Sequence, residues 1–232
     1  MLKVTKTKEN SHEMYFRWYC EELIQYGYLK RIDRELQMFS ILPEQKHKRE
    51  NHLKVKANTL EEYNLLQALE YTYDFRLIWN ESAYYIFTEL YVPGGHFVFG
   101  TPTFISHKIK IDGVEEIVSY VDVKPHYAAA KFGGGQNASY YTFPLIQKFL
   151  LFTRKLYINK IIPIHTGKHG RSTCLFATTF VPNSYRYTDK SGDLRKIPYR
   201  LRSITGYTEQ KKGIIDTIIK NNNSKNSQQS LL

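Results

Sequence analysis

The chain has 232 residues, of which 42% are hydrophobic and 15% aromatic, enough for one large domain with a buried core. Lys and Arg number 33 against 22 Asp and Glu, and the resulting net charge of +11 favours a polyanionic partner. No apolar run approaches the length of a membrane span, residues 1–6 lack the apolar stretch of a signal peptide, and two cysteines are too few for a disulfide framework. We therefore expect a cytoplasmic protein with reduced thiols and no membrane association.

The first predicted element is a helix from about His12 to Gln25, with Ser11 as its N-cap and Gly27 just past its end. Glu13 lies in the first turn of this helix, where acidic residues commonly support the helix dipole. An extended segment is predicted to follow the helix.

The next stretch, residues 43–58, is rich in Lys, Arg and His and has little to bury. It is predicted to be a solvated loop or insertion, or a basic flap over a substrate. A second helix is predicted over residues 60–69, because Thr59 and Glu62 have the spacing of a capping box.

Two β-hairpins are predicted in the middle of the chain. Residues 71–79 and 83–91 are rich in aromatic and β-branched side chains and are separated by a short polar turn. Residues 104–111 and 116–123 form the second hairpin around the Asp-Gly turn at 112–113.

The second hairpin leads into a predicted crossover. A glycine-containing loop over residues 126–138 precedes a strong helix over 141–157, and a short buried strand follows at 160–164. Strand, helix and strand in this order predict a βαβ unit with two parallel strands.

The C-terminal part is predicted to contain a last strand over residues 175–181, a turn-rich basic region over 182–202, and a closing helix over 205–220. Residues 221–232 are polar and of low complexity, so a disordered tail is expected there. No internal repeat or long linker interrupts residues 1–220, which are predicted to form a single domain.

Asp122 lies near the end of the strand predicted over residues 116–123, and Lys124 follows two residues later. Residues two apart in a strand point to the same face, so these two side chains should project together. A carboxylate and an ammonium at the end of an apolar strand are costly to desolvate. Such a pair suits a site that holds a divalent metal and a water beside a phosphate, with a strand-end salt bridge as the simpler alternative.

Four segments, in this order, resemble the PD-(D/E)xK nuclease superfamily, and in particular its phage-type and Holliday-junction-resolvase-like members. The segments are Ser11-His12-Glu13-Met14-Tyr15-Phe16, Tyr73-Asp74-Phe75, Val121-Asp122-Val123-Lys124-Pro125, and a helix and strand containing Phe143-x-Leu145-x-x-Lys148 and Ile161-Ile162-Pro163. The resemblance implies an α/β fold, a mixed central β-sheet flanked by helices with a restriction-endonuclease-like core over residues 11–165. A β-hairpin insertion would lie between Asp74 and Asp122, and residues 166–220 would form a basic C-terminal extension.

The same resemblance implies roles for individual residues. Asp74 and Asp122, with the carbonyl oxygen of Val123, would bind Mg²⁺, or Mn²⁺ in its place. Lys124 would position or help to deprotonate the attacking water. Glu13 would bind a second metal ion or order the water around the first.

Other residues are candidates for contacts with the nucleic-acid backbone. These are Gln147, Lys148, Lys168, Arg171, Arg195 and Lys196. Asp112 and Glu116 are nearer to Asp122 in sequence than Asp74 is, but Asp112-Gly113 fits a hairpin turn better.

The expected activity is that of a Mg²⁺-dependent endonuclease that hydrolyses phosphodiester bonds of DNA. The resemblance points to branched or structured DNA and to the proteins of phage or mobile-element replication, recombination or packaging, in the host cytoplasm for a phage protein. A homodimer is compatible with it, because resolvase-like members usually act as dimers. Two alternatives stay open: a non-catalytic nucleic-acid-binding or structural protein that uses the basic segments 44–56 and 186–202, and a nuclease subunit active only in a complex.

The remaining motifs support weaker hypotheses. His165 and His169 have metal-ligand spacing, but the glycine between them favours a loop. The glycines at 133–135 lack the Lys-Ser/Thr of a phosphate-binding loop. Cys20 and Cys174 are each expected to be core residues rather than nucleophiles.

Overall fold

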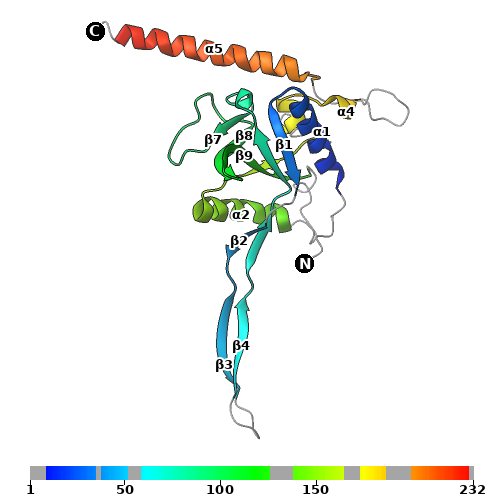
Figure 1. Cartoon of the computed structure of the whole chain (residues 1–232), viewed down its shortest axis with the longest axis vertical. Helices are drawn as coiled ribbons and strands as arrows, with labels where there is room; N and C mark the ends of the chain where they lie inside the picture. Colours follow the sequence, from blue (N-terminus) through cyan, green and yellow to red (C-terminus); the bar gives the residue numbers. More distant parts are fainter. Residues whose placement is uncertain are drawn as a thin grey trace.

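The computed structural model describes residues 9–34, 38–51, 59–125, 138–164, 173–186 and 200–229. A mixed central sheet with helices against it forms the body, and a long β-hairpin extends from one end while a helix crosses the opposite end (Figure 1). The fold class predicted from the sequence, α/β with a mixed central sheet flanked by helices, is confirmed.

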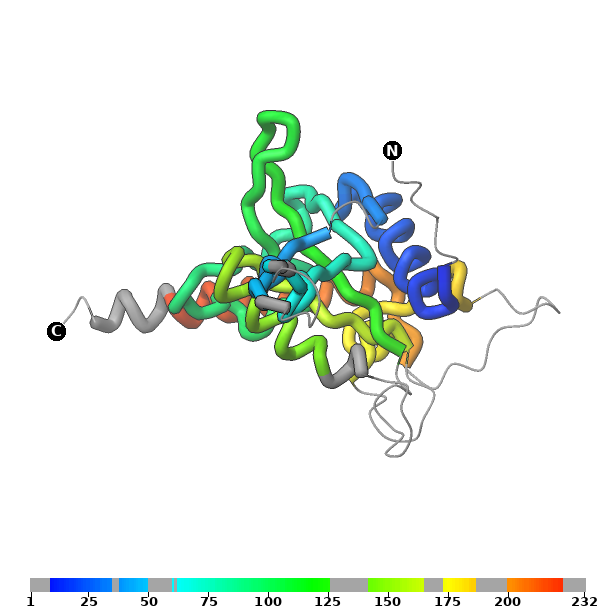
Figure 2. Tube along the Cα trace, turned by 90° about the horizontal axis from the view of Figure 1, so that it is seen from below, coloured from blue at the N-terminus to red at the C-terminus, as the bar shows by residue number. Residues whose placement is uncertain are grey.

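The central sheet has the strand order β1-β6-β9-β8-β7, with β10 also paired to β9. The strands are β1 (Leu29–Arg34), β6 (Phe75–Trp79), β7 (Thr88–Leu90), β8 (Phe104–Ile111), β9 (Val114–Val123) and β10 (Ile158–Ile161). β9 is antiparallel to β6 and β8 and parallel to β10. The predicted hairpin around residues 112–113 and the predicted parallel crossover are therefore both present, and Figure 2 shows the β8–β9 hairpin extending from the body.

β8 and β10 share one edge of β9, one after the other. β8 pairs with the first half of β9, up to Val118, and β10 pairs with the second half, from Tyr120 to Val123. Asn159 joins the two short strands: its side chain accepts the N–H of Ile105 at 2.8 Å and donates to the carbonyls of Ile105 and Tyr120 at 2.8 and 2.9 Å. This buried amide satisfies backbone groups that the change of partner would otherwise leave open.

Helix α1 (Ser11–Gln25) packs on one face of the sheet and helix α2 (Ala138–Arg154) on the other. Alternation along β9 divides the core: Val121 and Val123 belong to the α1 side, Val118 and Tyr120 to the α2 side. A large aromatic cluster fills the α1 side. It contains Phe16, Tyr19, Phe75, Trp79, Phe87, Phe104, Phe176, Phe180 and Tyr207.

α1 begins one residue earlier than predicted. Asn10, not Ser11, is its N-cap, because the Asn10 side chain accepts the N–H groups of His12 and Glu13 at 2.9 and 3.0 Å. Gly27 follows the helix with φ of +73°, as its predicted position past the end requires.

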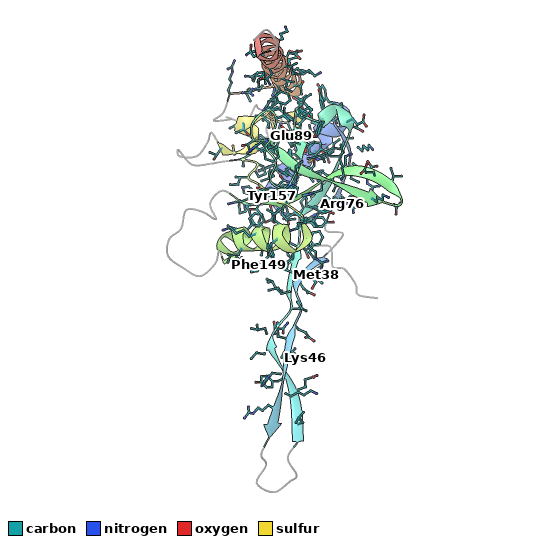
Figure 3. All side chains as sticks on the ribbon, turned by 90° about the vertical axis from the view of Figure 1, so that its left-hand side faces the viewer. Met38, Lys46, Arg76, Glu89, Phe149 and Tyr157 are labelled. Carbon is teal, nitrogen blue, oxygen red and sulfur yellow. The ribbon has the colours of Figure 1, made fainter. Side chains whose placement is uncertain are left out.

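The projecting hairpin, called the arm below, consists of residues 38–51 and 59–72 (Figure 1). β2 (Met38–Leu42) pairs with β5 (Leu69–Thr72), and β3 (Gln45–Asn51) pairs with β4 (Thr59–Leu66). In Figure 3, Lys46 lies far out on the arm and Arg76 of β6 lies in the body.

The arm corrects two predictions. Residues 60–69 are not a helix and residues 45–51 are not a loop, because the two segments pair with each other and bring Lys48 opposite Glu62 and Arg49 opposite Glu61. Leu60 is 61% exposed, so no core face is available that would favour a helix there. The arm also precedes Asp74, whereas the insertion was predicted between Asp74 and Asp122, a segment that instead supplies strands of the central sheet.

Two further predictions, both of strands, differ from the structure. Residues 83–91 do not return beside β6: a short 3₁₀ helix η1 (Glu81–Ala83) and a turn precede β7, which pairs in parallel with β8. Residues 175–181 form no strand, because helix α3 (Leu175–Thr178) begins where the Leu175 N–H donates to the Ile162 carbonyl at 2.8 Å.

After α4 (Asn183–Arg186), helix α5 (Ile204–Gln229) closes the chain. It continues through residues 221–229, where the sequence predicts a disordered tail. Within the described ranges, no helix combines the length and the hydropathy that a membrane crossing requires.

Candidate functional site

The end of β9 carries a buried ion pair. Asp122 is 3% exposed, and the Nζ of Lys124 lies 2.8 Å from its Oδ2. The ammonium also lies over the ring of Phe143 in α2, 5.7 Å from the centroid. The prediction that Asp122 and Lys124 project together is confirmed.

Asp74 is anchored to the same end of β9. It lies between β5 and β6, and its N–H donates to the carbonyl of Val121 at 3.1 Å. Its Oδ2 accepts the N–H of Val123 at 2.7 Å. The carboxylate thus bonds the backbone between Asp122 and Lys124, which places the two aspartates beside each other at the end of the sheet.

The proximity of the two carboxylates affects the pKa of Asp74. Burial, and then the charge of Asp122, raise that pKa from 3.8 to about 8, while the Val123 N–H opposes the shift and Glu13 adds to it. The pKa of Tyr71 is raised as well, because its hydroxyl is buried and faces Asp122 and Asp74. At neutral pH the two aspartates therefore need a shared proton or a bound cation.

Glu13 approaches this site from the first turn of α1. Its carboxylate accepts hydrogen bonds from the side chains of Asn10 and Arg34. Arg34 ends β1, so the ion pair ties the start of the helix to the edge of the sheet. The position predicted for Glu13 is thus near Asp74, but an arginine partly neutralises its charge.

The oxygen atoms at this site suit a hard divalent cation as ligands. Asp122 Oδ2 is buried and contacts the ammonium of Lys124, and within the described part of the chain no hydrogen bond to this oxygen is formed. The carbonyl of Val123 lies on the strand edge that its N–H occupies, toward Asp74. The described residues contain no group of three or more His, Cys, Asp or Glu placed to hold a metal. Two carboxylates, a carbonyl and several waters are nevertheless a sufficient set for Mg²⁺.

The other predicted site residues lie elsewhere. The side-chain amide of Gln147 donates to the carbonyl of Ile158 at 2.6 Å and so holds α2 to β10, while Lys148 is exposed. Glu116 is bound to Lys30, with 2.6 Å between Oε2 and Nζ, and Asp112 has φ of +50° in the hairpin turn. Asp74 is therefore the carboxylate that lies beside Asp122.

Several predicted residues lie outside the described ranges and have no structural account. They are Lys168, Arg171, Arg195, Lys196, His165, His169 and the glycines at 133–135. Both cysteines, Cys20 and Cys174, are buried, in agreement with their prediction as core residues.

Three residues of this region were missed at the level of sequence. Tyr71 places its hydroxyl beside the carboxylates, Arg34 binds Glu13, and Lys160 on β10 is in register with Asp122 on β9. The predicted parallel crossover places Lys160 on a strand parallel to that of Asp122, but the sequence does not predict the register between the two strands. Comparisons with protein-family models, with curated proteins and with solved structures found no match.

Proposed function

We propose that this protein is a divalent-metal-dependent endonuclease of DNA, built on a restriction-endonuclease-like variant of its α/β fold. One observation carries the proposal: the Asp74 carboxylate is bonded to the Val123 N–H beside the buried Asp122–Lys124 pair. Two buried carboxylates with a lysine at their side form a site whose charges are balanced only by a proton or a cation.

Each side chain has a definable task in this proposal. Asp74, Asp122 and the carbonyl of Val123 would hold Mg²⁺ or Mn²⁺, which when bound lowers the pKa of water and stabilises charge on a phosphate. Lys124 donates to the attacking water or to a phosphate oxygen, and Phe143 holds its ammonium in place. Glu13 orders water at the rim of the site, with Arg34 limiting its negative charge.

The net charge of +11 supports nucleic acid as the substrate, because a basic surface raises the affinity for phosphates. DNA with branches or other structure, and action as a homodimer, follow from the resemblance and belong to the same proposal.

A second candidate is a non-catalytic nucleic-acid-binding protein. It is favoured by the ion pairs themselves, because Lys124 and Arg34 neutralise Asp122 and Glu13 without a metal. A binder of this kind would tolerate a chelator, whereas a nuclease would stop.

The test is cleavage of plasmid and four-way-junction DNA with Mg²⁺, with Mn²⁺ and with EDTA. Asp122→Asn and Lys124→Met are compared with Glu115→Gln and Lys108→Met, a matched pair on the β8–β9 hairpin with 3.6 Å between Nζ and Oε2. We expect the site variants to lose at least about 100-fold in rate and the control variants to match the wild type.

Equal cleavage by all five proteins would indicate a contaminating nuclease and reject the assignment. No cleavage by the wild type, together with DNA binding that salt weakens and EDTA does not, would establish the second candidate.

A further inference from the structure

Tyr71 lies beside the carboxylate site, on the last strand of the arm. It belongs to β5 and pairs with Phe39 of β2, and its ring contacts the ring of Phe143 in α2, with 6.4 Å between the centroids. The ammonium of Lys124 lies over the same Phe143 ring. Tyr71 and Lys124 are therefore held by one aromatic side chain.

The hydroxyl of Tyr71 is directed toward the aspartates. Tyr73, two residues further along the chain, packs on Tyr120 with 4.9 Å between the ring centroids, and both tyrosines of this segment contact the core on the α2 side of the sheet. Asp122 follows Tyr120 by two residues in β9, so its side chain is on the same face. Burial, and then the charges of Asp122 and Asp74, raise the pKa of Tyr71, in agreement with a hydroxyl beside Asp122.

Two buried polar atoms at this point lack hydrogen bonds. The hydroxyl of Tyr71 and Oδ2 of Asp122 are both buried, and neither forms a hydrogen bond to a residue that the structure describes. The ammonium of Lys124, 2.8 Å from Oδ2, compensates the charge of Asp122. A buried hydroxyl and a buried carboxylate oxygen that lack hydrogen bonds each cost free energy, and a bond between the two would remove both costs.

Lys124 is the side chain whose position decides whether this bond is needed. In the proposed nuclease reaction its ammonium donates to the attacking water or to a phosphate oxygen, so its contact with Asp122 is shared or lost. A buried carboxylate that loses its cation is strongly destabilised. The O–H of Tyr71 rotates about its C–O bond, so it can donate to Asp122 while the ring stays on Phe143. As a neutral donor it would offset part of the loss.

We propose that Tyr71 is a positioning residue, which donates its O–H to Oδ2 of Asp122 when the ammonium of Lys124 turns to the substrate. This inference rests on the proposed function, because the reaction is what draws Lys124 away. The hydrogen bond holds the Asp122 carboxylate in place while Lys124 is engaged. Tyr71 touches neither the water nor the phosphate, and its proton is not transferred.

The first test is an unfolding experiment on the full-length protein in EDTA, which does not depend on cleavage. Tyr71→Phe removes the hydroxyl and keeps the ring against Phe143. Tyr73→Phe is the matched control, because the Tyr73 hydroxyl is also buried and forms no hydrogen bond to a described residue. The charged side chains that act on the Tyr73 hydroxyl are Arg76 and Asp33, not the carboxylates of the site.

Each change is made in the wild type and in Lys124→Met, and urea unfolding is followed in sucrose, which favours the folded state of the less stable variants. In the wild type we expect Tyr71→Phe to change the equilibrium constant for unfolding by less than about 2-fold, because no hydrogen bond is lost. In Lys124→Met the same change should raise the constant by at least about 5-fold, because the bond to Asp122 is then present. Tyr73→Phe should have one effect in both backgrounds. An equal effect of Tyr71→Phe in the two backgrounds would overturn the proposal, whatever the cleavage rates are.

The second test is cleavage of the same DNA substrates with Mg²⁺. Tyr71→Phe should lower kcat by at least about 10-fold and leave KM within about 2-fold of the wild type, because its hydroxyl is used only while Lys124 engages the substrate. Tyr73→Phe should change neither constant. In a protein that cleaves, equal kcat values for the two variants would also overturn the proposal. A wild type that does not cleave would reject the nuclease proposal, and the unfolding experiment would still decide whether Tyr71 donates to Asp122.

Discussion

The shared site of Asp74 and Asp122 makes the stability of the protein depend on pH in an unusual direction. In the absence of divalent cations, we expect the free energy of unfolding to fall as the pH rises toward neutrality. Asp74→Asn should remove most of this dependence, because an amide can still accept the Val123 N–H but cannot ionise.

The direction and the magnitude of this change in unfolding free energy follow from the pKa of Asp74. Its pKa is about 8 in the folded protein, compared with the ordinary value of 3.8 for an exposed side chain. The folded state holds the proton more tightly, so stability is greatest below the lower value and declines until the higher one is reached. Between about pH 5 and about pH 7 the loss should approach roughly 3 kcal/mol, at about 1.4 kcal/mol per pH unit.

The assay is urea unfolding across this pH range for the wild type, Asp74→Asn and the surface control Glu115→Gln. Mg²⁺ is then added to each protein. It should stabilise the wild type most at the higher pH, because a bound cation favours the deprotonated pair, and it should stabilise Asp74→Asn much less.

Two results would refute this reasoning. An Asp74→Asn variant with the wild-type slope would show that the proton is not held at this site. Equal stabilisation of all three proteins by Mg²⁺ would show that the ion binds elsewhere.

Three further predictions concern particular contacts. Asn10→Ala should lower the unfolding free energy by about 1 kcal/mol through loss of the α1 N-cap, whereas Ser11→Ala should have little effect; equal losses would argue against the observed cap. Lys124→Met should lower the unfolding free energy by about 3 kcal/mol, because Asp122 is left unpaired. Adding Asp122→Asn should recover most of this loss, and a double variant no more stable than Lys124→Met would contradict the pairing. Burial lowers the pKa of His107, whose Nε2 accepts the Tyr157 N–H. This residue therefore contributes stability that is lost as the pH falls below 6.5. His107→Gln should flatten the acidic side of the curve of unfolding free energy against pH, and an unchanged curve would contradict the role of its burial.

Some elements could be predicted from the sequence because their determinants are local. The β8–β9 hairpin has an Asp-Gly turn with φ of +50° and +84°, the conformation for which such a dipeptide is suited. Strand alternation places Asp122 and Lys124 on one face whatever the strand pairs with. The βαβ order similarly requires β9 and β10 to be parallel.

In the arm, a local sequence pattern predicts the wrong secondary structure. Thr59 and Glu62 have the spacing of a capping box, yet the segment is a strand because β3 offers it a partner. The apolar residues at 175–181 could extend as a strand, but a helix satisfies the Ile162 carbonyl at the end of β10. In both cases a contact between segments outweighs the intrinsic preference of a short stretch.

The fold class, the central hairpin, the crossover and the side-by-side placement of Asp122 and Lys124 could all be predicted before the structure, since each depends on spacing or on turn chemistry within a few residues. Other contacts are visible only in the folded chain: Asp74 bonds to Val123, 49 residues away, Arg34 binds Glu13, and Lys160 lies opposite Asp122. These contacts depend on strand register and burial, which arise from the packing of the whole sheet. The raised pKa of Asp74 has the same origin, because it results from desolvation and from a charge that folding brings close.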